Sequence, residues 1–72
     1  MADITFTFEE FIGVIQKQND GWSKELNLVK WNDHDAKYDI REWNEDHSRM
    51  TRGITLTPSE MRRVVKFMEG RV

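Results

Sequence analysis

The 72-residue chain has no cysteine and only one proline, Pro58. Without cysteine it has neither a disulfide to stabilise a small fold nor a cysteine-based zinc site. A chain of this length buries a modest fraction of its surface, so we expect one domain over residues 1–72 with a thin core. Because oligomerisation is the remaining common way to stabilise so small a core, the sequence predicts a homodimer.

Long apolar runs are also missing, and none approaches the length of a membrane-spanning helix. The first residues, 1–4, lead directly into an alternating pattern and lack the basic and apolar segments of a secretory signal. These features, with the lack of cysteine, predict a soluble cytoplasmic protein that has no membrane partner.

The chain lacks a basic excess, since 11 Lys and Arg stand against 13 Asp and Glu, for a net charge of −2. Proteins that bind nucleic acid usually have a clear basic excess, so the total charge argues mildly against that class. Local placement of cations can outweigh the total, because physiological salt screens charges beyond roughly 8 Å.

Catalytic and metal-binding motifs are not visible: there is no nucleophile elbow, phosphate-binding glycine loop or paired-carboxylate motif. His34 and His47 stand next to acidic residues, but in polar loops without a third ligand at a recognisable spacing. We interpret both as surface histidines. The sequence predicts a protein that is not an enzyme and needs no metal or cofactor.

What the chain does contain is period-two alternation, which is typical of strands. Residues 4–17 predict a long first strand, in which Gly13 indicates a bulge, a bend or a close backbone approach. Strict alternation places Phe6, Phe8, Ile12 and Val14 on one side of this strand and Phe11 and Ile15 on the other. Asn19-Asp20-Gly21 predicts a hairpin turn into a second strand at residues 22–31.

A third strand is predicted at residues 37–43 and a fourth at about residues 52–57, with a polar loop between them. A helix start follows, with Thr57 as N-cap, Pro58 at the first helical position and Glu60 completing a capping box. The element order predicts an α+β fold of four antiparallel strands followed by one C-terminal helix.

The helix carries an apolar stripe and should cover one face of the sheet. The stripe consists of Met61, Val64, Val65 and Met68, and Gly70 ends the helix. The sheet face expected beneath it bears Leu26, Leu28, Tyr38, Ile40, Ile54 and Leu56.

The opposite sheet face is left open, and alternation places Trp31, Lys37, Arg41 and Trp43 on it. Aromatic rings stack on unpaired bases of any identity, and neighbouring cations hold the phosphates, so this combination favours single-stranded nucleic acid. Alternatively, the two tryptophans pack in a second small core or across a dimer interface, and the pattern alone favours neither interpretation. Lys24 and Arg52 are candidates to extend the phosphate track.

These residues also resemble a known family. Residues 39–43 (Asp-Ile-Arg-Glu-Trp), the loop with Met50, and residues 52–60 are similar to the C-terminal domain of the eukaryotic transcriptional positive coactivator that binds single-stranded DNA. Residues 13–15, 21–29 and 31–32 resemble its small bacterial relatives, the YdbC-type proteins, more closely. The resemblance covers about residues 8–68 and implies a curved four-stranded antiparallel sheet, a C-terminal helix and a symmetric homodimer.

The resemblance also assigns residues. It matches Arg41 to a basic residue of the third strand, and Arg52 to the basic residue before the fourth. Trp31 and Trp43 match aromatic residues at the ends of the second and third strands, with Trp43 matched to within one position. The more basic loop and the regulatory tail of the coactivators have no counterpart here, so coactivation itself is not implied.

Together these features predict sequence-nonspecific binding of single-stranded DNA in transcription, replication or repair, at the nucleoid of a bacterial cytoplasm. The predicted site comprises Lys24, Trp31, Lys37, Arg41, Trp43 and Arg52. Single-stranded RNA is an alternative ligand, because stacking and phosphate contacts do not read the sugar. The rival from another class is a protein–protein interaction module that docks a partner on the same aromatic face, which suits the slightly acidic chain better.

Overall fold

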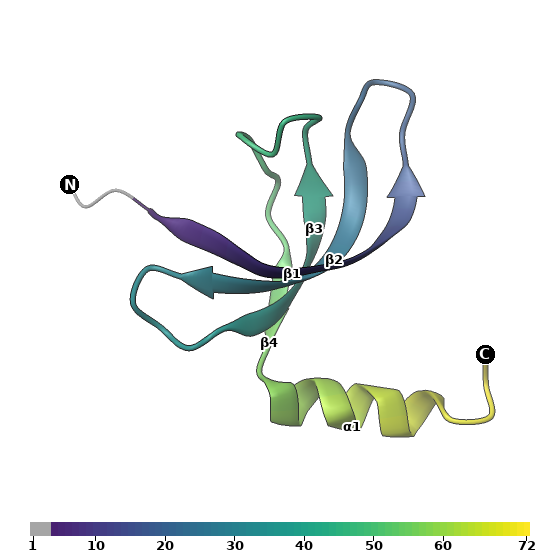
Figure 1. Ribbon diagram of the computed structural model, residues 1–72. Helices are drawn as coiled ribbons and strands as arrows, with labels where there is room; N and C mark the ends of the chain where they lie inside the picture. The colour runs from purple at the N-terminus through teal and green to yellow at the C-terminus, as the bar shows by residue number, and fades with distance from the viewer. Residues whose placement is uncertain (1–3) are drawn as a thin grey trace.

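The computed structural model describes residues 4–72, which form one open sheet and one helix (Figure 1). The elements are β1 (Phe6–Lys17), β2 (Ser23–Trp31), β3 (Lys37–Trp43), β4 (Ile54–Leu56) and α1 (Pro58–Met68). The strands are antiparallel neighbours in the order β1-β2-β3-β4, which confirms the predicted fold class. The N-terminal residues in which no signal was found lie, apart from Ile4, outside the described part. Within residues 4–72, no helix is long and apolar enough to cross a membrane.

Local sequence signals set the element boundaries. In the turn between β1 and β2, Gly21 has a φ of +89°, a conformation that glycine adopts without a steric penalty. At the start of α1, the Thr57 side chain accepts a hydrogen bond from the Glu60 amide at 3.1 Å, and Glu60 accepts one from the Thr57 amide at 2.8 Å. This capping box satisfies amide groups that the first helical turn leaves unpaired, as predicted.

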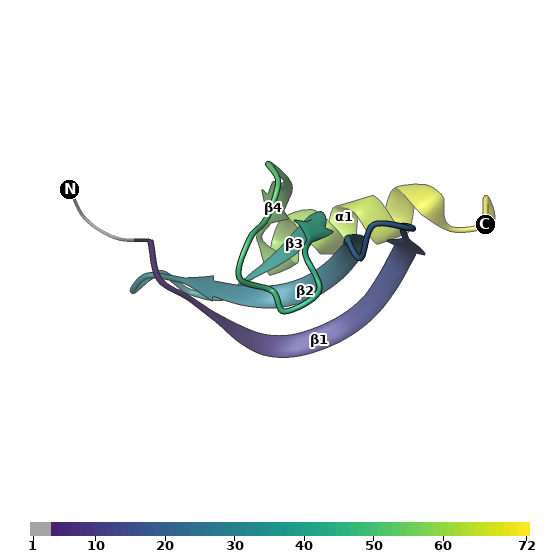
Figure 2. The same cartoon turned by 90° about the horizontal axis from the view of Figure 1, so that it is seen from above.

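β1 is longer than its partner, with 12 residues against nine in β2. The register shifts between Phe8 and Glu10, between Phe11 and Gly13, and between Val14 and Gln16. Each shift inserts one extra residue on β1, and such bulges bend a strand. Figure 2 shows β1 as a strongly bent ribbon at the edge of the sheet.

These bulges correct the predicted alternation of β1. Because each extra residue reverses the faces of those that follow, Phe11 lies opposite Asn27 and shares the face of Phe8. The Phe8 and Phe11 rings stack with centroids 4.6 Å apart. The bulge expected near Gly13 is confirmed, whereas a close backbone approach there is not, since a Cβ at Gly13 would meet no atom of the described residues within 4 Å.

The sheet has two faces, because residues directly opposite each other in the ladder point the same way. The aromatic face bears Phe8, Phe11, Glu25, Asn27, Val29, Trp31, Lys37, Asp39, Arg41 and Trp43. The aliphatic face bears Leu26, Leu28, Tyr38, Ile40, Ile54 and Leu56. Of the described apolar side chains, those of Val29 and Trp43 are fully buried, at 0% exposure. The core of the single chain therefore lies on the aromatic face.

The prediction that the helix covers the aliphatic face is wrong. Within residues 4–72, α1 approaches only β3 and β4, and none of its residues is buried. Leu26 and Leu28 stay half-buried, and Ile54 is 55% exposed. The reason is the connection: only Thr57 separates β4 from α1, and Figure 1 shows the helix lying beyond the end of β4 rather than across the sheet.

Candidate nucleic-acid interface

Aromatic rings from three strands and one loop meet on the aromatic face. The Trp43 ring lies 5.2 Å from that of Phe6, 4.9 Å from Phe8 and 5.7 Å from His47, measured between centroids. Because these rings enclose it completely, Trp43 is not available for stacking on a base. The prediction of an exposed Trp43 is therefore wrong, and the alternative of a tryptophan packed in a small core holds for this residue.

A cleft on the same face brings three predicted site residues together. It has a volume of about 360 Å³ and is lined by Ile4, Trp31, His34, Asp35, Lys37, Arg41, Met50 and Thr55. Small-molecule pockets span about 300–1,000 Å³, so this cleft is suited to one base rather than to a longer segment. Trp31 is half-buried in it, and Lys37 makes no ion pair within residues 4–72.

The Arg41 guanidinium contacts three neighbouring side chains. Its Nε and Nη2 each donate to an oxygen of Asp39 at 2.7 Å, and Nη1 donates to the Met50 sulfur at 3.4 Å. Its Cζ lies 4.6 Å from the centre of the Trp31 ring, which is cation–π geometry. Since Asp39 is 0% exposed, its carboxylate compensates the charge of Arg41 at close range. Arg41 is thus placed to fix the Trp31 ring more than to hold a phosphate.

Gly53 makes this arrangement of Arg41 possible. A Cβ at position 53 would lie 2.3 Å from the Arg41 Cβ and 2.4 Å from the Ile40 carbonyl oxygen, closer than van der Waals contact. We expect Gly53→Ala to lower the free energy of unfolding by about 1–3 kcal/mol, because such overpacking forces the backbone to shift. Urea denaturation measures this change. Gly13→Ala is the matched control, since no atom in the described part of the chain lies within 4 Å of that Cβ. Equal effects of the two substitutions would contradict the prediction.

The remaining predicted cations lie elsewhere. Lys24 is paired with Glu42 across β2 and β3, so it is on the aliphatic face, opposite to Trp31. The prediction that Lys24 extends the phosphate track beside Trp31 is therefore wrong, because alternation along β2 places the two side chains on opposite faces. Arg52 is exposed immediately before Gly53, outside the lining of the cleft but next to the residue that packs on Arg41.

Comparison with known proteins identifies the family of this chain. The family model "Transcriptional Coactivator p15 (PC4)" matches residues 18–67. The chain belongs to this family. The p15 coactivator family is associated with single-stranded-DNA binding and with coactivation.

A relative of this family member is found in Treponema pallidum (strain Nichols), where it is described as an uncharacterized protein. The two are 45% identical over 49 residues, which make up 68% of this chain and 58% of the relative. The match therefore spans a little over half of that protein's length.

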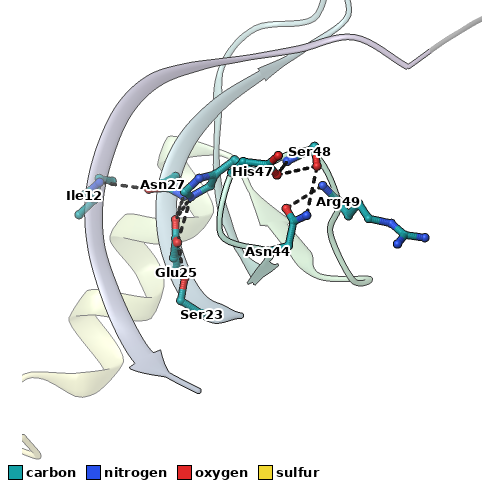
Figure 3. A network of polar contacts seen from close by, with 9 residues as sticks. Ile12, Ser23, Glu25, Asn27, Asn44, His47, Ser48 and Arg49 are labelled. Carbon is teal, nitrogen blue, oxygen red and sulfur yellow. Dashed lines mark hydrogen bonds and ion pairs between the residues drawn. The ribbon is translucent and has the colours of Figure 1, made fainter. Parts of the chain in front are cut away.

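A polar network supports the other end of the aromatic face (Figure 3). The buried Glu25 carboxylate accepts hydrogen bonds from the Ser23 hydroxyl and from the Asn27 amide, and lies 3.0 Å from His47 Nε2. The Asn27 amide oxygen in turn accepts from the Ile12 amide at a bulge of β1. The network thus joins the loop after β3 to β2 and β1, and His47 is not the surface histidine that the sequence suggested.

Glu25 makes the stability of this family member dependent on pH. Burial acts to raise its pKa, but the hydrogen bonds from Ser23, Asn27 and His47 and the charge of His47 outweigh burial and hold the pKa below the ordinary 4.5. A carboxylate whose pKa is lower in the folded than in the unfolded chain stabilises the fold at pH values above its ordinary pKa. This stabilisation is lost as the pH falls through the lowered pKa of the folded state.

We therefore expect Glu25→Gln to be less stable than the parent protein at pH 7, with the difference shrinking as the pH falls below about 4.5. Urea denaturation at pH 7, 5, 4 and 3 measures it. Glu10→Gln, at an exposed position of β1, is the matched control. A difference that stays constant down to pH 3 would contradict the role of Glu25.

Several residues in or beside the cleft were not predicted from the sequence. Asp39, the buried partner of Arg41, lies between Lys37 and Arg41 on the same side of β3, so alternation already placed it beside them. Met50, His34 and Asp35 enter from loops, whose course no periodicity describes.

Proposed function

We propose that this chain binds single-stranded DNA without sequence preference through its aromatic face, as a homodimer of the YdbC-like bacterial branch of the p15 coactivator family. The observation that carries the proposal is the cleft in which Trp31 lies beside Lys37, in a member of a family associated with such binding. DNA that is transiently unpaired in transcription, replication or repair is the proposed target. Such a role would place the protein at the nucleoid.

The mechanism uses stacking and charge, without a catalytic step, a metal or a cofactor. One base stacks on Trp31, whose ring is kept in place by Arg41 and Phe6. Lys37 and the exposed Arg52 contact the backbone phosphates on either side. These contacts do not involve the sugar, so single-stranded RNA is a second candidate ligand.

A homodimer is supported by the apolar surface that one chain leaves exposed. Ile54 of the sheet is 55% exposed, and Val64 and Val65 of the helix are 40% and 57% exposed. A second copy that covers the aliphatic face and the apolar stripe of α1 would bury this surface and add a core that the single chain lacks. Sedimentation at micromolar concentration tests this: a dimer is expected, and a stable monomer would refute it.

The direct test is a fluorescence titration with a thymidine oligonucleotide of about twenty nucleotides at two salt concentrations, with a duplex as control. Saturable quenching is expected, weaker at higher salt and much weaker for the duplex. Comparison with a uridine oligonucleotide separates DNA from RNA preference. A flat titration at low salt would contradict the proposal and favour the rival function, a protein-docking surface on the same face.

A further inference from the structure

Charge is distributed unevenly along this chain. Residues 1–57 contain seven Lys and Arg against eleven Asp and Glu, whereas residues 58–72 contain four against two. The acidic character of the protein therefore belongs to the sheet and its loops, and the basic excess belongs to α1 and the residues after it. A polyanion meets favourable charge most readily at the helix.

The helix cations form one surface. Arg62, Arg63 and Lys66 line a shallow groove together with Ser59 and Phe67, and all five residues are exposed. Within residues 4–72, the two ion pairs are Arg41–Asp39 and His47–Glu25, so none of these three cations is in an ion pair.

The groove lies on the far side of α1 from its apolar stripe. At 3.6 residues per turn, Arg63 and Lys66 fall on the side opposite to Met61 and Met68, and Arg62 falls between the two sides. A second subunit that covers the apolar stripe therefore leaves the groove accessible. Phe67, at the flank of the groove and 66% exposed, adds an aromatic ring to the cations, which is the same combination as on the aromatic face.

We propose that this groove on α1 is a second binding surface for single-stranded DNA, which contacts the phosphates of a strand that extends beyond the aromatic face. The inference rests on the proposed function and adds a separate site to it. Cations beside an exposed ring match a flexible polyanion with unpaired bases. An acidic protein partner would match the charge but would leave the position of Phe67 among the cations without a role.

The test compares thymidine oligonucleotides of about six and about thirty nucleotides, bound to the full-length protein at several salt concentrations. The variant is Arg62→Gln/Arg63→Gln/Lys66→Gln, since glutamine keeps helix propensity and all three positions are exposed. Lys17→Gln/Lys30→Gln/Arg49→Gln removes the same charge from exposed positions outside both surfaces and is the matched control. Circular dichroism and sedimentation verify that fold and oligomeric state are kept.

The helix variant is expected to bind the long oligonucleotide at least about tenfold more weakly, with a salt slope reduced by about two, and the short one as the parent protein does. The matched control should change either affinity by much less. Unchanged binding of the long oligonucleotide, or an equal loss in the matched control, would overturn the inference. A loss of dimer in the helix variant would also overturn it, by assigning the groove to a subunit contact.

These outcomes separate the two proposals. If the parent protein binds the short oligonucleotide, and the helix variant binds the long oligonucleotide as tightly as the parent protein does, only the proposal of the second surface is wrong. If the parent binds the long oligonucleotide alone, and the helix variant loses this binding, the second surface holds and the aromatic face is wrong. If the parent binds neither, both proposals fail.

Discussion

Trp43→Ala is expected to lower the free energy of unfolding by about 3–5 kcal/mol, the usual cost of truncating a buried aromatic residue. Trp43 is fully buried and is one of two fully buried apolar side chains among residues 4–72, the other being Val29. Its ring fills the space between Phe6, Phe8 and His47. Because small domains are stable by only about 5–15 kcal/mol, this single substitution should remove most of the stability.

Urea denaturation followed by circular dichroism measures the effect, and Trp43→Phe is the informative control. Among residues 4–72 the indole N–H of Trp43 finds no hydrogen-bond partner, so phenylalanine loses ring volume but no hydrogen bond. Trp43→Phe should therefore be much more stable than Trp43→Ala and should bind DNA like the parent protein. A loss below about 1 kcal/mol for Trp43→Ala would show that the aromatic cluster is not the core.

Trp31→Ala is expected to weaken binding of single-stranded DNA by about 1–3 kcal/mol per stacked base, or roughly 5- to 150-fold. Trp31 is the half-buried aromatic residue of the cleft, beside Lys37 and under Arg41. The loss should depend little on salt, because stacking releases no counterions, whereas Lys37→Ala should reduce the salt slope by about 0.7.

Anisotropy of a labelled thymidine oligonucleotide measures both variants without relying on tryptophan emission. Trp31→Phe should retain part of the affinity, because its ring still offers a stacking surface. Trp22→Phe, at a half-buried position outside the lining of the cleft, controls for a general effect of losing an indole. Affinity of Trp31→Ala equal to that of the parent protein, with the fold intact, would remove Trp31 from the site.

The elements of this fold were predictable because local chemistry decides them. The third strand was predicted at the residues that form β3, and Thr57, Pro58 and Glu60 were predicted in their capping roles. Turn residues and caps act over a few positions of the chain, so their effect is readable without knowledge of distant contacts.

The faces of the sheet were predictable only where the ladder is regular. Along β3, alternation correctly placed Lys37, Arg41 and Trp43 together. Along β1, three register shifts reversed the alternation, and Phe11 came to lie beside Phe8 rather than on the other side. A bulge depends on how two strands pair, and the sequence of one strand does not contain that information.

The sequence by itself determined the order of the elements, the capped helix and the set of aromatic and basic residues from which a binding face is made. Only the tertiary structure decided which of them are accessible: Trp31 remains at the cleft, Trp43 is enclosed by neighbouring rings, and Asp39 compensates Arg41. The physical reason is that burial and charge compensation depend on side chains brought together from different strands, whereas periodicity reports only the direction in which each side chain leaves its own strand.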